Sequence, residues 1–519
     1  MYIRLLTAIL LSALLTATAS SQPKGSSKDT ESAKVSEPKG PEKFEGKNLH
    51  EWLKTATTDP DSAVREQALM AISNFSHSEV RKVCGKTLVS RAGGNEHDNG
   101  VRIVLINFIG DLGVEEADTA DAVRILASSA STPGVFRFYA LQALGKFKSK
   151  AYGRINDLNG ILLDPSYVIR QTFAKTLGQI GSSETSGPSI KALQMLGSLS
   201  KDPCAVVRLA ALQSLCSMGP SWAANAKPGV QAEINEKEAQ ETIDLLKSRI
   251  GGKKAATASE TDKQIELWCR LVIIRFNPKV ELDDQLNGIA AHLSDPEPSV
   301  KVQALAILGL LAENAAPKLQ DVVKVLDGGG LAESAAALRT RQVVRVAALH
   351  TLGAIGGKAI DPILRIIDNP KEYTEIRIAA LDALAKLGEK GEAGREILKT
   401  IITNDANLKG EGVDLLIHAL TALGSMGVKA RGSIPELEDL MKRLDKARDK
   451  RLASPEHTMM LNSPELKMML DKLDPDERKK LLDKLLENPE DQFKKGVENT
   501  IRYIQESTPG HPGGEHKKP

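Results

Sequence analysis

Small and apolar residues recur along this chain at the spacing of a helix face, in a pattern that is repeated from Asp59 to Gly427. Counted from a basic residue, a small or apolar residue follows three and seven positions later, and an apolar residue ten positions later. These offsets fall on one side of an α-helix, so we predict an all-α protein. The pattern is found at nine positions, with leucine replacing the basic residue in the last: Arg65, Arg102, Arg137, Arg170, Arg208, Lys301, Arg345, Arg377 and Leu416.

The copies follow one another at a nearly constant interval of roughly 37 residues. The longer gap between Arg208 and Lys301 has room for one degenerate copy, which we place at Gln264, Leu267, Leu271 and Ile274. A repeat of this length indicates a solenoid, in which each helix pair packs only on its neighbours. We expect an α-solenoid of about ten helix pairs over residues 44–450.

The copy that starts at Asp202 shows how one repeat is built. Asp202 is a residue type that caps helices, and Pro203 suits the first helical position, where no amide hydrogen is needed. Gly219 is placed to end the helix, and one face carries Val207, Ala211, Leu215 and Met218. The aspartate precedes the arginine by six residues, which is roughly 240° around a helix. We therefore do not expect these two side chains to pair within one helix.

The combined pattern, Asp-Pro-x-x-x-Val-Arg-x-x-Ala-x-x-x-Leu-Gly, resembles HEAT repeats, and especially those of the bilin-lyase-like branch that is common in bacteria. The resemblance extends over roughly residues 44–450. Residues 44–53 resemble the segment that precedes the first repeat in exported bacterial HEAT proteins, where Trp52 caps the exposed end of the stack. The resemblance implies a structural ladder, in which each basic residue reaches acceptors in the next repeat: Arg65, Arg102, Arg137, Arg170, Arg208, Lys301, Arg345 and Arg377.

The resemblance also implies that the second helix of each pair lines the concave side of the solenoid. Positions two, five and nine residues after the basic residue form the polar part of that helix, which is otherwise largely apolar. This band is consistent with an ordinary solvated helix face and also with a groove that binds an extended peptide. We expect the centre of such a groove at Tyr139, Gln142, Lys146, Lys175 and Gln179, with Asn107, Gln213, His350 and His418 as further members.

The two ends of the chain have compositions that predict export and disorder. A short basic start, an apolar run from Leu5 to Leu15 and the small residues Ala17-Thr-Ala19 predict a signal peptide over residues 1–19. We therefore expect an exported protein, periplasmic or extracellular, with membrane contact only if the signal segment is uncleaved. Residues 20–43 and the tail 508–519 are predicted to be disordered, because neither segment supplies a core.

Two segments depart from the repeat. Residues 220–262 contain two prolines, a charged helical stretch and a Gly-rich loop, and we interpret them as an insertion or an eroded repeat. After Gly427, a helix from Ile434 to about Arg451 resembles a first helix without its partner. Residues 451–507 are predicted to form a charged helical extension.

The sequence contains no motif of a catalytic or cofactor site. Gly-x-Ser-x-Gly, Gly-x-Gly-x-x-Gly and His-Glu-x-x-His are all absent. His350 and His418 lie two repeats apart, which is too far to share a metal ion. The net charge of +2 disfavours the binding of nucleic acid. We therefore predict no cofactor and no nucleic-acid partner.

The four cysteines, Cys84, Cys204, Cys216 and Cys269, contain no Cys-x-x-Cys pair, so neither a zinc site nor haem attachment is indicated. Cys204 and Cys216 lie roughly 18 Å apart along one helix, which excludes a disulfide between them. Other pairings stay open, and buried thiols without a disulfide are the expected state.

Two hypotheses for function follow from these patterns. The leading one is an exported, non-catalytic helical scaffold that binds a protein or peptide in its groove. The alternative is a bilin-lyase-like enzyme, or a ligand-binding protein derived from one, which repeat similarity alone suggests. A lyase would need a strongly apolar pocket with a reactive side chain, and the groove residues offer neither.

Overall fold

The computed structural model describes residues 41–132, 134–183, 187–225, 230–250, 262–328, 334–410, 412–454 and 489–507. Helices make up nearly all of the regular structure in these ranges, which confirms the all-α prediction. The only strands among them are the two-residue strands β1 (Ser182–Ser183) and β2 (Gly187–Pro188), which pair antiparallel. The chain forms two compact units, Met1–Gly288 and Ile289–Pro519, which we call unit 1 and unit 2.

Unit 1 is a series of helix pairs. The first helices are α2 (Leu49–Thr58), α4 (His77–Ser90), α6 (Thr119–Ser131), the 3-10 helix η3 (Lys148–Leu163), α9 (Ile190–Leu199) and α11 (Val230–Arg249). The second helices are α3 (Ser62–Ile72), α5 (Asn99–Leu112), α7 (Phe136–Lys146), α8 (Tyr167–Ile180), α10 (Ala205–Asn225) and α12 (Lys263–Phe276). Short connections carry η1 (Arg91–Asn95) and η2 (Glu116–Asp118), and α13 (Pro278–Ala291) spans the division between the units.

Unit 2 continues the same alternation. After η4 (His292–Ser294), the second helices are α14 (Pro298–Leu311), α16 (Ala335–Ile355), α18 (Thr374–Leu387) and α20 (Gly412–Ser425). The first helices are α15 (Leu319–Asp327), α17 (Ile360–Ile367), α19 (Arg395–Thr403) and α21 (Ile434–Leu452). Short 3-10 helices join them: η5 (Ala312–Lys318), η6 (Gly357–Ala359), η7 (Gly388–Gly394), η8 (Asp405–Leu408) and η9 (Gly427–Ser433), and the last helix is α25 (Pro489–Glu506).

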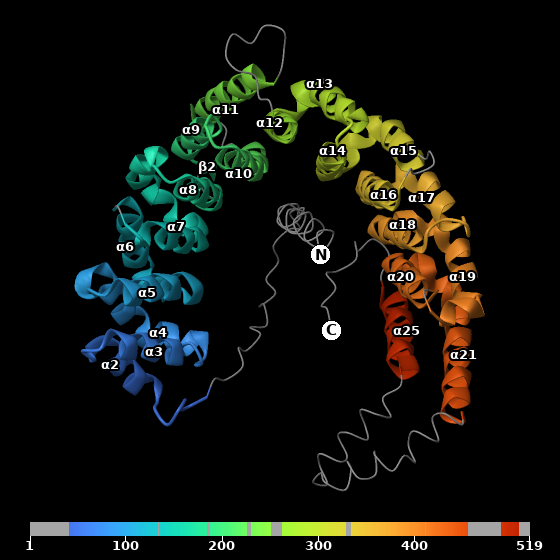
Figure 1. Cartoon of the computed structure of the whole chain (residues 1–519), viewed down its shortest axis with the longest axis horizontal. Helices are drawn as coiled ribbons and strands as arrows, with labels where there is room; N and C mark the ends of the chain where they lie inside the picture. Colours follow the sequence, from blue (N-terminus) through green and yellow to red (C-terminus); the bar gives the residue numbers. More distant parts are fainter. Residues whose placement is uncertain are drawn as a thin grey trace. The chain divides into compact units, whose positions relative to one another are not determined.

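Within each unit, the second helices form one layer and the first helices another (Figure 1). In unit 1, the helices α5, α7, α8, α10 and α12 contact one another in this order, and in unit 2 the same holds for α14, α16, α18 and α20. A second helix is therefore covered on both flanks. In α10, the predicted inward residues Val207, Ala211, Leu215 and Met218 are at most 1% exposed. Burying each larger side chain of this kind contributes about 1.5–3 kcal/mol.

The turn before α10 corrects the predicted helix start. α10 begins at Ala205, so Pro203 lies outside the helix. The Asp202 carboxylate accepts a hydrogen bond of 2.8 Å from the Cys204 amide, which closes a turn ahead of the helix. The predicted helix end at Gly219 is also wrong, because α10 continues to Asn225. A glycine tolerates a helix end but does not impose one.

The long gap in the repeat pattern contains a helix pair. α11 packs on α9 and on α12, which is the helix of the degenerate copy. Its inward residues Ala239, Ile243 and Leu246 are buried. Of the two interpretations of residues 220–262, this packing favours an eroded repeat.

The last helix corrects another prediction. The sequence pattern leaves α21 without a partner, but α25 packs against α21, α20 and η9. Val497, Ile501 and Ile504 form the buried face of α25. α21 and α25 thus form a helix pair beyond the last repeat that the pattern predicted. The sequence pattern missed this pair because more than thirty residues separate the two helices, which is outside the usual range of repeat connections.

The first helix carries the predicted cap. Trp52 is 9% exposed, its indole Nε1 donates to the Phe44 carbonyl at 3.0 Å, and the Lys47 ammonium lies 4.4 Å from the ring centroid. The predicted signal peptide, most of the linker, and the tail 508–519 lie outside the described residues. No helix in the described part of the chain is long and apolar enough to cross a membrane.

Candidate functional site

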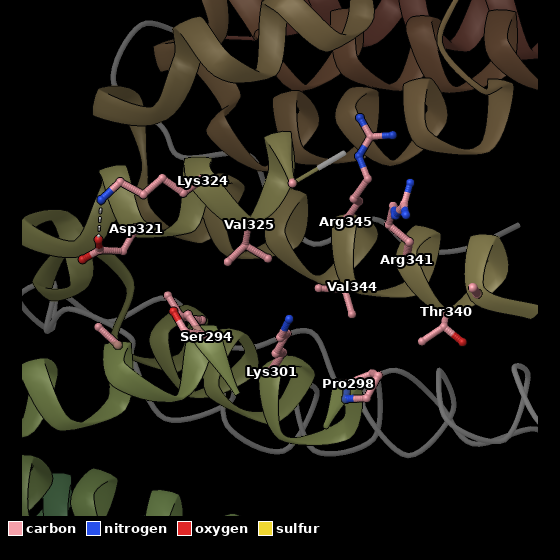
Figure 2. A pocket seen from close by; sticks show the side chains of 14 residues that line it. Ser294, Pro298, Lys301, Asp321, Lys324, Val325, Thr340, Arg341, Val344 and Arg345 are labelled. Carbon is pink, nitrogen blue, oxygen red and sulfur yellow. Dashed lines mark hydrogen bonds and ion pairs between the residues drawn. The ribbon is translucent and has the colours of Figure 1, made fainter. Parts of the chain in front are cut away.

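An open pocket in unit 2 lies between the N-terminal parts of α14 and α16 and the C-terminal part of α15 (Figure 2). Its cavity volume is about 600 Å³. Lys301, Lys324, Arg341 and Arg345 line it together with the carboxylate of Asp321. None of the predicted groove residues lines this pocket, whereas Lys301 and Arg345 belong to the predicted ladder.

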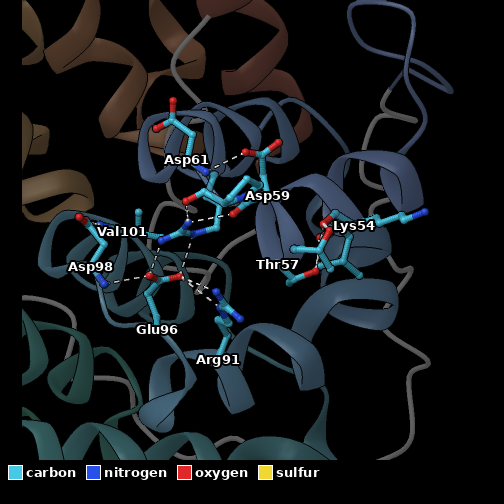
Figure 3. Close-up of polar contacts among 12 residues, drawn as sticks. Lys54, Thr57, Asp59, Asp61, Arg91, Glu96, Asp98 and Val101 are labelled. Carbon is cyan, nitrogen blue, oxygen red and sulfur yellow. Dashed lines mark hydrogen bonds and ion pairs between the residues drawn. The ribbon is translucent and has the colours of Figure 1, made fainter.

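At the start of the solenoid, Arg65 of α3 links two repeats through Glu96. Figure 3 shows Glu96 with its neighbours Arg91 and Asp98. The Arg65 guanidinium donates to both carboxylate oxygens of Glu96, at 2.7 and 3.1 Å, and to the carbonyl of Asp59 at 2.9 Å. Glu96 also accepts from Arg91 at 3.1 Å and from the Asp98 amide at 2.9 Å. Burial by itself would raise the pKa of Glu96, but these hydrogen bonds, first of all that from Arg65, hold the pKa below its ordinary value.

The same arrangement recurs in three later repeats. Arg170 donates to the two carboxylate oxygens of Asp202 at 2.6 and 3.0 Å, and Arg345 donates to Glu372 at 2.7 and 2.9 Å. Arg137 forms an ion pair with Asp164. In each case the acceptor lies five or six residues before the next basic residue, and its carboxylate also accepts an amide of the turn that it begins. The arginine therefore fixes the turn of the following repeat.

The predicted ladder is wrong at Arg102. The positions that would supply its acceptor are Ser131 and Thr132, which carry no charge. Its guanidinium instead lies over the ring of Phe136 in the next repeat, 4.5 Å from the centroid. The contact between repeats is kept, but a ring face replaces the carboxylate.

The ladder also changes at two other positions. Arg377 donates to the carbonyl of Ile367 at 3.0 Å, a bond that stays inside one repeat. Arg208 donates to the carbonyls of Asp202 and Pro203 at 3.0 Å, as Arg65 does to the carbonyls of Asp59 and Pro60. No carboxylate among the described residues lies within ion-pair distance of Lys301, so the ladder is interrupted there.

The predicted groove residues of unit 1 lie on the outward face of neighbouring second helices. Gln142, Lys146, Lys175 and Gln179 are exposed, while Asn107, Tyr139 and Gln213 are half-buried. The Tyr139 ring meets Phe138 edge to face, with centroids 5.3 Å apart. The next residue, Ala140, is fully buried. The helices are therefore oriented as the pattern predicted, and α7, α8 and α10 lie side by side (Figure 1).

Charges in this band are partly neutralised between neighbouring repeats. Lys146 of α7 forms an ion pair with Asp111 of α5. In unit 2, His418 Nδ1 of α20 lies 2.5 Å from the Asp382 carboxylate of α18. His350 and His418 are thus on helices with α18 between them, and no three His, Cys, Asp or Glu side chains of the described residues are arranged to hold a metal ion.

His350 has an unusual environment for a band residue. Its Nδ1 is buried and finds no hydrogen-bond partner among the described residues. Burial lowers the pKa of His350, and Lys386 lowers it further, while Asp382 acts in the opposite direction. Burial and Lys386 therefore both favour the neutral imidazole.

The sequence reasoning missed a row of exposed valines. Val135, Val168 and Val206, which are 57%, 39% and 41% exposed, each stand two residues before the ladder arginine of α7, α8 and α10. At 100° per residue this position lies within roughly 40° of the polar band, on the same face. Tyr167 and Leu163 are exposed close by in sequence. The signal was present in the sequence as a valine at a constant offset, but periodicity alone does not distinguish an exposed valine from a core one.

The four cysteines are all described, and none takes part in a disulfide. Cys84 and Cys269 are buried, and Cys204 and Cys216 are half-buried. Burial, with a smaller effect of Glu79, raises the pKa of the Cys84 thiol to about 12. Burial likewise raises the pKa of Cys216 to about 11. Thiols in this state are poor nucleophiles.

Comparison with known proteins identifies the repeat. Residues 123–216, from α6 into α10, match the family described as HEAT repeats. A crystal structure of importin beta in a polyethylene glycol condition has a similar fold, with a TM-score of 0.50 and 12% identity. That match covers 76% of this chain and 57% of the importin chain. The two structures therefore share the fold of an α-solenoid.

Two further structures are similar at a lower level. A structure of Kap95p with RanGDP matches with a TM-score of 0.48 and 15% identity, over 88% of this chain and 66% of that chain. The Kap95:Nup1 complex matches with a TM-score of 0.45 and 10% identity, over 88% and 67%. This chain thus spans 57% to 66% of the importin beta and Kap95p chains of the first two structures. No curated protein matches the sequence. The bilin-lyase-like branch stays a prediction.

Proposed function

We propose that this protein is an exported, non-catalytic HEAT-repeat scaffold that binds an extended segment of a partner protein across α7, α8 and α10. The observation that carries the proposal is the outward face of these helices, where the valine row borders Tyr139 and a set of amide and lysine side chains. A surface of this composition has both the apolar contacts and the hydrogen-bonding groups that recognition of a peptide requires.

The dimensions of the face suit an extended chain. Packed helices lie 8–10 Å apart, so three neighbours span about 20 Å, the length of roughly six residues of an extended strand. A peptide that crosses the helices would meet one side chain of each helix in turn. The specificity for the peptide sequence would then depend on which row of side chains the peptide contacts.

The chemistry along each helix changes from apolar to polar. Val135, the residue before α7, is followed on the same face by Tyr139, Gln142 and Lys146. A half-buried tyrosine such as Tyr139 supplies a rigid contact at a small entropic cost, which is why tyrosine is enriched at binding hot spots. Glutamine amides donate and accept hydrogen bonds, as Gln142, Gln179 and Gln213 would do with a peptide backbone. Lys146 is already paired with Asp111, which leaves Lys175 as the lysine at the centre of the face.

Substitution of Tyr139 tests the binding face. Peptides selected from a random library on the full-length protein provide the probe, and their affinity is measured by fluorescence anisotropy. Tyr139→Ala should weaken binding by roughly 1–2 kcal/mol without a change in thermal stability. Tyr373→Ala removes a more exposed tyrosine, 49% exposed, outside the face, and should leave binding unchanged.

Two results would contradict the binding face. Equal affinity of the wild type and Tyr139→Ala would place the site elsewhere. Ala140→Arg, which places a charge at the fully buried neighbouring position, provides the reference for a destabilised core. A loss of stability in Tyr139→Ala as large as that in Ala140→Arg would show that the Tyr139 side chain belongs to the core.

Export rests on the sequence of the first residues and is tested separately. The mature N-terminus of the protein from its source cell should be at Ser20 or a close neighbour. Intact Met1 in the cytosolic fraction would refute export, but this result would not bear on the proposed binding face.

A further inference from the structure

The turn between η3 and α8 presents two large apolar side chains to solvent. Leu163, the last residue of η3, is 90% exposed, and Tyr167, the first residue of α8, is 51% exposed. Val168 of the valine row follows directly, so the turn adjoins the binding face at the middle one of its three helices. Three exposed apolar residues within one turn are a cluster and not isolated surface residues.

The first repeat shows that the fold does not require apolar residues at these positions. Its turn also has the sequence Asp-Pro, with Thr58 as the last residue of α2 and Ser62 as the first residue of α3. Arg65 donates to both carbonyls of that Asp-Pro pair, as Arg170 does in the turn before α8. The same turn is therefore built with a threonine and a serine in place of the leucine and the tyrosine.

The polar groups of the turn before α8 are paired within the protein. The Asp164 carboxylate forms an ion pair with Arg137 and accepts the Ser166 amide at 2.9 Å. The carbonyls of Asp164 and Pro165 accept from Arg170 at 2.6 and 3.3 Å. A partner that covers this turn therefore leaves these groups satisfied, and it meets a surface that is already held in one conformation.

Tyr167 is flanked by small residues on the two neighbouring helices. Three positions before the ladder arginine, where α8 has Tyr167, the chain has Gly134 before α7 and Ala205 at the start of α10. Both α7 and α10 contact α8. A large side chain of a partner can therefore lie beside the Tyr167 ring.

The chemistry of the turn selects an apolar side chain. Its one carboxylate, Asp164, is 4% exposed and paired, so the turn itself presents no charge to a partner. A charged side chain placed against Leu163 and Tyr167 would lose water without gaining a counter-charge from the turn. An aliphatic or aromatic side chain would instead bury apolar surface on both residues.

We propose that the turn Leu163–Val168 is the anchor point of the binding face, where one aliphatic or aromatic side chain of the partner segment packs against Leu163 and Tyr167. The inference rests on the proposed function and adds to it the chemistry of the partner. Because α8 is the middle helix, the apolar residue lies near the middle of the roughly six residues that cross the face.

Random peptides displayed on phage and selected on the full-length protein provide the probe. The selected peptides should share Leu, Ile, Phe, Tyr or Trp at one central position. The same selection on the double variant Leu163→Thr/Tyr167→Ser should show no such preference. A consensus peptide with a charged residue at the central position would overturn the inference.

The two substitutions introduce the residues that the first repeat carries in the same turn, so the thermal stability should stay unchanged. Each should weaken binding of the fluorescein-labelled consensus peptide by about tenfold. Tyr373→Ser is the matched control, because it removes a 49% exposed tyrosine at the start of α18 in unit 2. It should change the dissociation constant less than about twofold.

A double-mutant cycle tests whether the central residue of the peptide contacts this turn. Alanine at the central position should weaken binding to the wild type by about tenfold, but binding to the double variant by less than about twofold. Equal losses on both proteins would place the apolar residue elsewhere and overturn the inference. The proposed function would then still stand if Tyr139→Ala weakens binding, and it would fail together with the inference if Tyr139→Ala has no effect.

Parallel measurements decide between the peptide and other occupants of the turn. Vesicles of phosphatidylglycerol and phosphatidylcholine that sediment with the wild type, but not with the double variant, would indicate a membrane contact. A dimer of the wild type that the double variant does not form would indicate a second copy of this chain. Either result would overturn the assignment of the turn to a partner segment.

Discussion

At the scale of single residues, the stack is held in register by carboxylates that serve two repeats at once. Asp202 closes the turn before α10 through the Cys204 amide and also receives the guanidinium of Arg170. Burial by itself would raise the pKa of Asp202, but the bonds from Arg170 and the Cys204 amide lower it. A low pKa in the folded state means that the ion pair stabilises the fold at neutral pH and loses that effect in acid.

Removal of Arg170 tests this role. Arg170→Met leaves Asp202, whose side chain is 5% exposed, without its counter-charge, so the unfolding free energy should fall by roughly 3 kcal/mol. Lys150→Met removes another ion pair between repeats, with Glu116, in which both side chains are about half exposed or more. This control should cost less than about 1 kcal/mol. Urea unfolding followed by circular dichroism compares them, and equal losses would contradict a special role for the ladder.

His350 should make stability depend on pH. Its pKa is lower in the folded state than the ordinary value of about 6.5, chiefly because of burial and then of Lys386. Around and below pH 6.5, the unfolded chain therefore binds more protons at this group than the folded chain does. The unfolding free energy consequently decreases as the pH is lowered. His350→Gln should remove part of the decline between about pH 7 and pH 5. The exposed His77→Gln is the control, and identical pH slopes for both variants would show that His350 titrates normally.

At the scale of the helix, the distance between second helices depends on small residues at the contact. Gly110 of α5 faces Ala143 of α7 so closely that a Cβ at Gly110 would lie 2.8 Å from the Ala143 Cβ and 2.9 Å from its Cα. The same closeness recurs at Gly353 of α16, where the Ala383 backbone lies 2.9 Å from the position of a Cβ. Backbone contact of this kind leaves no flexible side chain to move aside.

The close approach predicts opposite effects for two glycine substitutions. Gly110→Ala should lower the unfolding free energy by about 1–3 kcal/mol, because α5 and α7 must separate. Gly496→Ala in α25 meets nothing within 4 Å and should raise stability by about 0.5–1 kcal/mol through helix propensity. The midpoints of urea unfolding measure both changes. Stabilisation by Gly110→Ala would mean that the two helices are further apart than described.

At the scale of the whole molecule, each repeat contacts only its neighbours in the described residues, and the chain forms two compact units. Stability in such a protein is close to a sum of repeat and interface contributions. A defect in one repeat should therefore unfold the repeats around it and leave distant ones folded.

Ala140→Arg tests this locality. The substitution forces a charged side chain into a position that is 0% exposed in α7. Amide hydrogen exchange should become fast in α5, α7 and α8 while protection persists in α16, α18 and α20 of unit 2. Loss of protection in both units together would show a single cooperative structure.

The sequence by itself determined the class of the fold, the period of the repeat and the orientation of the second helices. These features depend on local spacing, because an apolar residue at three, seven and ten positions defines a helix face wherever the helix lies. The burial of Ala140 and the exposure of Gln142 followed from the same count. The HEAT resemblance implied that a basic residue reaches acceptors in the next repeat, but it did not identify those acceptors.

Only the tertiary structure decided which distant elements meet. It joined α25 to α21 across more than thirty residues, placed Phe136 under Arg102, and left Lys301 beside a pocket instead of an acid. The exposure of the valine row also became evident only in the tertiary structure, because the sequence pattern does not distinguish an exposed valine from a buried one. These contacts depend on connection lengths and on where each helix begins, and the packing of neighbouring repeats fixes both.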